Sequence, residues 1–140
     1  MKNKQSGFSL IELLLVVVII GVIAAIAVPS LMRAKTVAED GSAYSTMRAL
    51  STLQTSYYTR NNRYATLSEL LSDQEIRLGT IQGNTLKRSV FTYTMSPNPN
   101  PSPADLKDEY EIIASRPGIR DEPPYILRLK QDSVITLITE

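Results

Sequence analysis

Acidic side chains form the densest group of chemically active residues in this chain. Four of them lie in one short stretch: Asp105, Asp108, Glu109 and Glu111. Carboxylate oxygens are the ligands that Ca²⁺ prefers, so Asp105, Asp108 and Glu109 are candidate calcium ligands, and calcium is the one cofactor to consider. A solvated charged surface explains the same residues and is the favoured alternative, because the final strands lack an Asp-rich loop.

The chain contains no Cys and no His. This composition excludes thiol nucleophiles, disulfides, imidazole bases and the Cys/His ligand sets of zinc, haem and iron–sulfur centres. The sequence also has no Gly-rich phosphate loop and no Ser-based nucleophile at a recognisable spacing, so it predicts no enzyme. A formal net charge of +1 at pH 7 gives no reason to expect a specific nucleic-acid partner.

Glu12 is the only charged residue between Phe8 and Leu31. A helix over this stretch would be about 36 Å long, which is enough to cross the roughly 30 Å hydrocarbon core of a bilayer. A carboxylate within such a span costs on the order of 2.5–3.5 kcal/mol at the bilayer centre and less near an end. One interpretation is that Glu12 lies close enough to the interface to reach the headgroups, or is protonated. The other is that its carboxylate pairs with a cationic group on another chain. Its position alone leaves both interpretations open.

The apolar segment itself has two interpretations. The first is a membrane-spanning helix over residues 8–31. The second is a secretory signal, since Ala25-Ile26-Ala27 fits the small-x-small cleavage pattern and would release a soluble protein beginning at Val28. The length of the apolar run and the place of Glu12 at its threshold favour the membrane span.

The residues after the span predict an amphipathic helix half over 32–60, followed by a head over 61–140. One helix face carries an apolar stripe: Val37, Tyr44, Met47, Leu50, Leu53 and Tyr57. Asn61-Asn62 is the expected stop, because Asn tolerates left-handed backbone geometry. Residues 61–89 are predicted as a loop with one short helix, in which Thr66 and Glu69 have capping-box spacing.

Alternating and β-branched residues predict strands in the remainder of the head. The expected strands are Val90–Met95, Tyr110–Ser115, Tyr125–Lys130 and Val134–Ile138. The last two are separated by few enough residues for a hairpin, and an antiparallel meander on the helix is the simplest assembly. The predicted fold class is therefore α+β, with a long N-terminal helix, half membrane-spanning and half amphipathic, packed against a small antiparallel sheet.

The stretch Lys4-Gln5-Ser6-Gly7-Phe8-Ser9-Leu10-Ile11-Glu12-Leu13-Leu14 closely resembles the N-terminal processing motif of type IV pilins and type II secretion pseudopilins. The shared features are a short basic leader ending in Gly7, an aromatic Phe8, Glu12 as the fifth residue from Phe8, and then an apolar helix. The resemblance is specific over residues 1–35 and implies a type IV pilin-like fold with a leader peptide at residues 1–7.

The resemblance also implies how the chain is processed. A prepilin peptidase and methyltransferase is expected to cut between Gly7 and Phe8 and to methylate the new amino terminus of Phe8. Glu12 would then neutralise the amino group of Phe8 in a neighbouring subunit and so set the register of assembly. The segment from Gly21 to Pro29 is expected to melt or kink on packing into a fibre, since Pro29 lacks an amide donor and Gly21 costs about 1 kcal/mol relative to Ala.

The function implied by the resemblance is that of a pilin, a homopolymer subunit of a helical type IV pilus-like filament. Such a subunit is stored in membrane lipid as a single-pass protein of the inner (cytoplasmic) membrane, with its head outside the cytoplasm. An inner-membrane platform and an ATPase would then assemble it into an extracellular pilus. The alternative is a type II secretion pseudopilin acting in a periplasmic pseudopilus, and a third hypothesis is a monomeric tethered domain in which Glu12 has no role.

The absence of Cys is a departure from the resemblance. Many pilus-forming members close their C-terminal region with a disulfide, whereas this chain must hold that region by strand pairing, by a metal or by filament contacts. Major pseudopilins carry a calcium site toward the C-terminal end, which is a second reason to consider calcium here.

Overall fold

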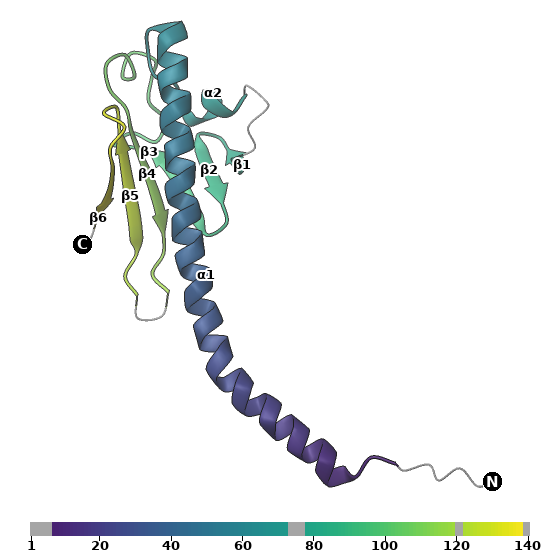
Figure 1. Cartoon of the computed structure of the whole chain (residues 1–140). Helices are drawn as coiled ribbons and strands as arrows, with labels where there is room; N and C mark the ends of the chain where they lie inside the picture. Colours follow the sequence, from purple (N-terminus) through teal and green to yellow (C-terminus); the bar gives the residue numbers. More distant parts are fainter. Residues whose placement is uncertain (1–6, 73–77, 120–121, 139–140) are drawn as a thin grey trace, which may run out of the picture. The chain divides into compact units, whose positions relative to one another are not determined.

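The computed structural model describes residues 7–72, 78–119 and 122–138. The elements, in chain order, are α1 (Leu10–Asn61), α2 (Leu67–Ser72), β1 (Thr80–Gln82), β2 (Thr85–Arg88), β3 (Phe91–Met95), β4 (Glu111–Arg116), β5 (Tyr125–Lys130) and β6 (Ile135–Ile138) (Figure 1). The chain forms two compact units, which meet between Ala38 and Glu39. The first part of α1 belongs to the N-terminal unit and the rest of it to the C-terminal unit.

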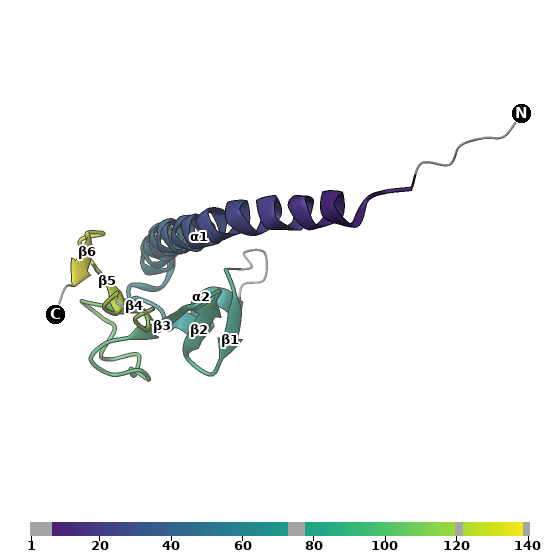
Figure 2. The same ribbon diagram turned by 90° about the horizontal axis from the view of Figure 1, so that it is seen from below.

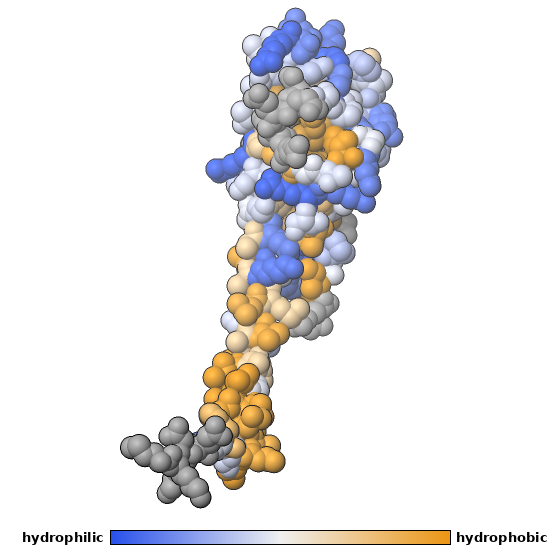
Figure 3. Space-filling model, turned by 90° about the vertical axis from the view of Figure 1, so that its right-hand side faces the viewer, coloured by the Kyte–Doolittle hydropathy of each residue, from blue (hydrophilic) through white to orange (hydrophobic). Residues whose placement is uncertain are grey.

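The N-terminal unit consists of the first part of α1 and the short segment before it. The helix is long and apolar enough to cross a membrane, and no part of its most apolar stretch is buried within the structure. Phe8 and Leu10 are 84% and 83% exposed, and Figure 3 shows apolar side chains over the face of the helix turned to the viewer. An apolar surface of this extent needs lipid or other protein to cover it.

The C-terminal unit contains a sheet that lies on one side of the second half of α1 (Figures 1 and 2). Within the described residues the sheet has six strands in the order β1-β2-β3-β4-β5-β6, and each strand is antiparallel to the next. The α+β fold and the antiparallel meander predicted from the sequence are therefore confirmed. Each of the four expected strands is present, with bounds that differ from the prediction by no more than one residue.

The prediction of a loop with one helix over residues 61–89 is wrong in its second half, where β1 and β2 form a hairpin. Gly83, with a φ of 61°, and Asn84 make the two-residue connection. Two-residue hairpins need positive φ at the turn, which Gly adopts at no steric cost. Both strands are too short to show a clear alternation, so the Gly83-Asn84 pair was the available signal.

Gly79, just before β1, lies where a side chain has no room. A Cβ atom at this position would overlap the backbone carbonyl oxygen of Lys87 on β2. We expect Gly79→Ala to lower the free energy of unfolding by about 1–3 kcal/mol, because the backbone must shift to relieve the overlap. Near-UV circular dichroism of the full chain in detergent during thermal unfolding measures this effect.

Gly41→Ala is the matched control for that substitution. Gly41 lies in α1 and a Cβ atom there meets nothing within 4 Å, so we expect Ala to be neutral or to stabilise by up to about 1 kcal/mol. Equal effects of the two substitutions would contradict the steric explanation.

The helix face that packs against the sheet differs in part from the predicted apolar stripe. Met47 and Leu50 are fully buried as expected, but Tyr44 is 38% exposed and Val37 is 70% exposed. The buried face of α1 also contains small and polar residues: Ala43, Thr46, Ser51 and Gln54. A stripe predicted from apolar residues alone misses polar residues whose hydrogen bonds are satisfied in the core.

Gln54 shows how a polar residue is accommodated there. Its side-chain amide donates to the carbonyl of Ala65 and its carbonyl accepts from the Ala65 amide, both at 2.8 Å. These two bonds hold the connection after α1 against the helix. The helix ends at Asn61, and Asn62 has a φ of 53°, which confirms the predicted stop.

The predicted capping box of α2 is confirmed. The Glu69 amide donates to Thr66 Oγ1 at 3.2 Å, and the Thr66 amide donates to Glu69 Oε2 at 2.9 Å. The same carboxylate forms an ion pair with Arg63, with Nη2 at 2.6 Å from Oε1. The Arg63 guanidinium, helped by the Thr66 donors, lowers the pKa of Glu69 from 4.5 to about 2.

This pKa shift predicts how the stability of the head depends on pH. Because the pKa of Glu69 is lower in the folded chain, its contribution is complete above pH 4.5 and is lost as the pH falls through about 2. We expect the loss to be about 1–2 kcal/mol, since a side chain that is 35% exposed is screened by solvent. Glu69→Gln should weaken the dependence of the unfolding free energy on pH between pH 5 and 2. An unchanged dependence in that variant would show that Glu69 is not its source.

Candidate assembly site at the N-terminal helix

The residues around the expected cleavage point are open and lie before the first helical turn. Gly7, Phe8 and Ser9 are not helical and are exposed. A Cβ atom at Gly7 would meet nothing within 4 Å. A peptidase needs an accessible, non-helical backbone at the bond that it cuts, and this segment offers one.

Glu12 is positioned by the start of its own helix. Its Oε2 accepts a hydrogen bond from the Ser9 amide at 3.2 Å, and the Leu13 amide donates to the Ser9 carbonyl at 3.3 Å. Ser9 and Glu12 thus have the spacing of a capping box, a feature that the sequence analysis did not identify. A carboxylate in the first turn also interacts favourably with the helix dipole. Glu12 is therefore held at the N-terminal end of α1, which follows Phe8 in the chain.

Gly21 and Pro29 both lie within the continuous helix α1. Proline has no backbone N–H, so the helix lacks one hydrogen bond in the turn before Pro29, and Gly21 is a poor helix former. Melting of this segment is expected on packing into a fibre, and it stays a prediction for the single chain described here.

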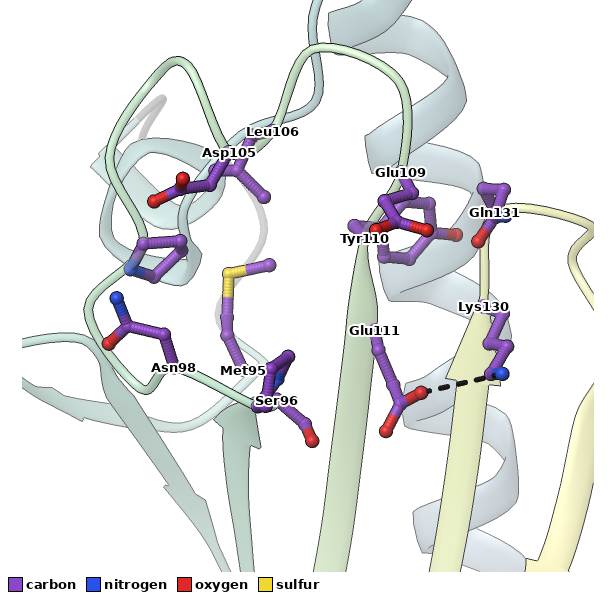
Figure 4. A pocket seen from close by; sticks show the side chains of 12 residues that line it. Met95, Ser96, Asn98, Asp105, Leu106, Glu109, Tyr110, Glu111, Lys130 and Gln131 are labelled. Atoms are coloured by element: carbon purple, nitrogen blue, oxygen red, sulfur yellow. Dashed lines mark ion pairs between the residues drawn. The ribbon is translucent and has the colours of Figure 1, made fainter.

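Two of the three candidate calcium ligands line a pocket of about 450 Å³ at one end of β3, β4 and β5 (Figure 4). Asp105 and Glu109 line it, whereas Asp108 does not. Asp105 Oδ2 accepts from the Ser102 amide and from Ser102 Oγ, both at 2.8 Å, and these bonds lower the pKa of Asp105.

Glu111, the fourth member of the acidic stretch, is paired with cations of β5. Its carboxylate lies 3.5 Å from Arg128 Nε and 3.6 Å from Lys130 Nζ. Among the described residues no group of three acidic side chains has the geometry of a metal site. Calcium binding at Asp105, Asp108 and Glu109 stays a prediction.

The head is fastened to the helix by a buried ion pair that sequence analysis missed. The Arg116 side chain at the end of β4 is 3% exposed, and its Nε lies 2.8 Å from Oδ1 of Asp40 on α1. Nη2 donates to Asp40 Oδ2 at 3.2 Å and to Glu122 Oε2 at 3.4 Å. The two partners are far apart in sequence, so no local pattern relates them.

Strand pairing and a hydroxyl contact hold the C-terminal region. β6 is paired with β5 over four residue pairs. At the turn between them, Ser51 Oγ on α1 donates to Ser133 Oγ at 2.9 Å. Of the three means of closure that the absence of Cys left open, strand pairing is present.

Comparison with known proteins identifies relatives of the N-terminal half. Residues 2–28 match the family model of the prokaryotic N-terminal methylation motif. The chain is 41% identical over 68 residues to type II secretion system core protein G of Aeromonas hydrophila, covering 49% of this chain and 48% of that protein. It is 39% identical over 62 residues to type IV major pilin protein PilA of Myxococcus xanthus, covering 44% of this chain and 28% of that protein.

A longer alignment reaches into the head. The chain is 29% identical over 99 residues to a fimbrial protein of Neisseria meningitidis, covering 69% of this chain and 58% of that protein. The chain matches about half the length of the secretion protein and less of PilA. The N-terminal half of this chain is thus similar to a type II secretion pseudopilin and to a type IV pilin, and residues 2–28 match the N-terminal methylation motif.

Proposed function

We propose that this chain is a structural subunit that polymerises into a type IV pilus-like filament. The observation that carries the proposal is the contrast between its two units. The head buries its own core, whereas the apolar helix over residues 8–31 leaves its large side chains exposed. Lipid covers such a helix before assembly, and a bundle of identical helices covers it afterwards.

Processing of the N-terminus is the first step of the proposed function. A prepilin peptidase cuts between Gly7 and Phe8 and methylates the amino group of Phe8. The match to the methylation motif over residues 2–28 supports this step, and so does the exposed, non-helical backbone at Gly7 and Phe8. The cut leaves α1 attached to the head.

Pairing between subunits is the second step. The Glu12 carboxylate neutralises the Phe8 amino group of a neighbouring subunit. Each charge alone is costly in a lipid-like interior, and a partner offsets much of that cost. Because a subunit shifted along the fibre leaves both charges unpaired, the pair also sets the register. The hydrogen bond from the Ser9 amide holds the Glu12 carboxylate at the N-terminal end of α1. The amino terminus of a neighbouring subunit must reach this end.

Membrane storage and assembly machinery complete the proposal. The subunit waits in the inner membrane as a single-pass protein with its head outside the cytoplasm. An assembly platform and an ATPase extract it, and the Gly21–Pro29 segment melts as the helices pack. These partners are those that the resemblance to pilins implies, and the similarity to a type IV major pilin and to a fimbrial protein supports the resemblance.

A pseudopilus is the second candidate, because the alignment with core protein G has the higher identity of the two N-terminal matches. In that case the filament is short, lies in the periplasm and serves protein secretion. Deletion of the gene separates the two candidates. A pilus subunit is recovered in the sheared surface fraction, and its loss leaves secretion intact. A pseudopilin is missing from that fraction, and its loss traps secreted proteins in the periplasm. A deletion that abolishes neither fibres nor secretion would defeat both.

A further inference from the structure

The order of the sheet gives its two edges opposite strand directions. Within the described residues the strands follow one another from β1 to β6, and every neighbouring pair is antiparallel. Six alternating strands make β1 and β6 run in opposite directions. A second copy in the same orientation therefore presents a β1 that is antiparallel to β6, so the sheet continues from one copy to the next with ordinary hydrogen bonding.

The β6 edge lacks the features that usually prevent such pairing. Its residues, Ile135-Thr136-Leu137-Ile138, include no charge and no proline. β6 pairs with β5 on one side, and no described strand pairs with its other side. Edge strands of soluble proteins are normally protected by Lys, Pro or a bulge. An unprotected apolar edge indicates a surface that pairs with another strand.

Side chains on the inner face of β6 are incompletely covered. Leu137 lies opposite Leu127 of β5, which is 2% exposed, yet Leu137 itself is 50% exposed. Ile135 lies opposite the fully buried Leu129 and has the same orientation. The apolar inner face of the sheet thus extends to β6 and is half exposed at Leu137.

The β1 edge has matching properties. Thr80-Ile81-Gln82 carries no charge, and Ile81 lies opposite Leu86, which is fully buried. Ile81 is therefore on the inner face, like Ile135 and Leu137. Placing β1 of a second copy beside β6 sets its Ile81 next to Leu137 or Ile135 on one continuous apolar face and buries no charge.

From strand direction, register and side-chain character, we propose that β6 of one copy pairs with β1 of a second copy in the same orientation. The contact joins two different surfaces, so the same contact repeats from copy to copy, and an open filament forms when the rotation between copies does not close a ring. The inference rests on the proposed function, since identically oriented copies occur in a polar filament.

Disulfide cross-linking tests this contact directly, because the chain has no Cys of its own. Thr136→Cys combined with Gln82→Cys tests one register, and Thr136→Cys combined with Thr80→Cys tests the other. Oxidised filaments of one double variant should give a ladder beyond the dimer on a denaturing gel. Thr136→Cys alone should give no cross-link. Cβ atoms of facing residues on antiparallel strands are close enough for a disulfide.

Three outcomes would overturn the inference. Intact filaments without a ladder in either double variant would exclude the edge contact and leave the filament function standing. A dimer from Thr136→Cys alone would show β6 pairing with itself. Absence of filaments from the unsubstituted chain would overturn the proposed function and this inference together.

A charge on the edge provides a second measurement. Leu137→Lys should lower filament recovery more than tenfold while near-UV circular dichroism shows a folded head. Val90→Lys is the matched control, because Val90 is 39% exposed and lies in the connection between β2 and β3, away from both edges. Equal recovery from the two variants would overturn the proposal.

Discussion

Glu12→Ala is expected to leave a processed, membrane-held protein whose recovery as filaments falls more than tenfold. Removing one partner of a buried ion pair costs about 3–5 kcal/mol, because the remaining charge is left uncompensated. Here that charge is the Phe8 amino group of the neighbouring subunit. Each 1.4 kcal/mol is a factor of about ten in an equilibrium, so each subunit contact is weakened severely. The measurement is the amount of subunit in the sheared fraction relative to the membrane fraction.

Glu12→Gln distinguishes pairing from capping. In the single chain Glu12 accepts a hydrogen bond from the Ser9 amide, and a Gln side chain keeps an oxygen for that bond while losing the charge. Pairing predicts that both variants assemble poorly. If Glu12→Gln assembled normally and Glu12→Ala did not, the role of Glu12 would be to start its own helix. Normal assembly of both would leave the residue without a role in the filament.

Arg116→Ala is expected to have the largest effect on the stability of the head. The Arg116 side chain is 3% exposed and the Asp40 side chain 18% exposed, and the guanidinium also lies 5.3 Å from the ring centre of Tyr125. Its removal leaves Asp40 largely buried without its partner and a void beside that ring. We expect a loss of about 3 kcal/mol, the lower end of the range for a broken buried pair. This loss lowers the melting temperature of a head of this size by roughly 12–24 °C.

Lys130→Ala is the matched control for the buried pair. Lys130 pairs with Glu111 at 3.6 Å, but its side chain is 48% exposed. Exposed ion pairs contribute at most about 1 kcal/mol. Thermal unfolding of the full chain in detergent should therefore show a small shift for Lys130→Ala and a large one for Arg116→Ala. Similar shifts would mean that burial does not decide the strength of the Asp40 contact.

Features that depend on neighbouring residues were predictable from the sequence. The apolar run that contains Glu12 is visible in consecutive residues, as is the Thr66–Glu69 capping box of α2. The β5–β6 hairpin follows from two β-rich stretches with a short break between them. In each case the residues that form the pattern are close together in the sequence.

Features that depend on distant residues were not predictable in this way. Asp40 and Arg116 meet because the sheet packs on α1, and neither residue shows a pattern of its own. Gln54 can be buried because the backbone of Ala65 forms hydrogen bonds with its side-chain amide. The hairpin of β1 and β2 was missed because its strands, of three and four residues, are too short to show a clear alternation.

The intact mass and N-terminal sequence of the protein from membrane and sheared surface fractions test filament assembly through a processed N-terminus. The account predicts a chain that begins with methylated Phe8, with Glu12 as its fifth residue. A chain that begins at Val28 would make this a secreted soluble protein and would contradict the filament model, because Phe8 and Glu12 would both have been removed.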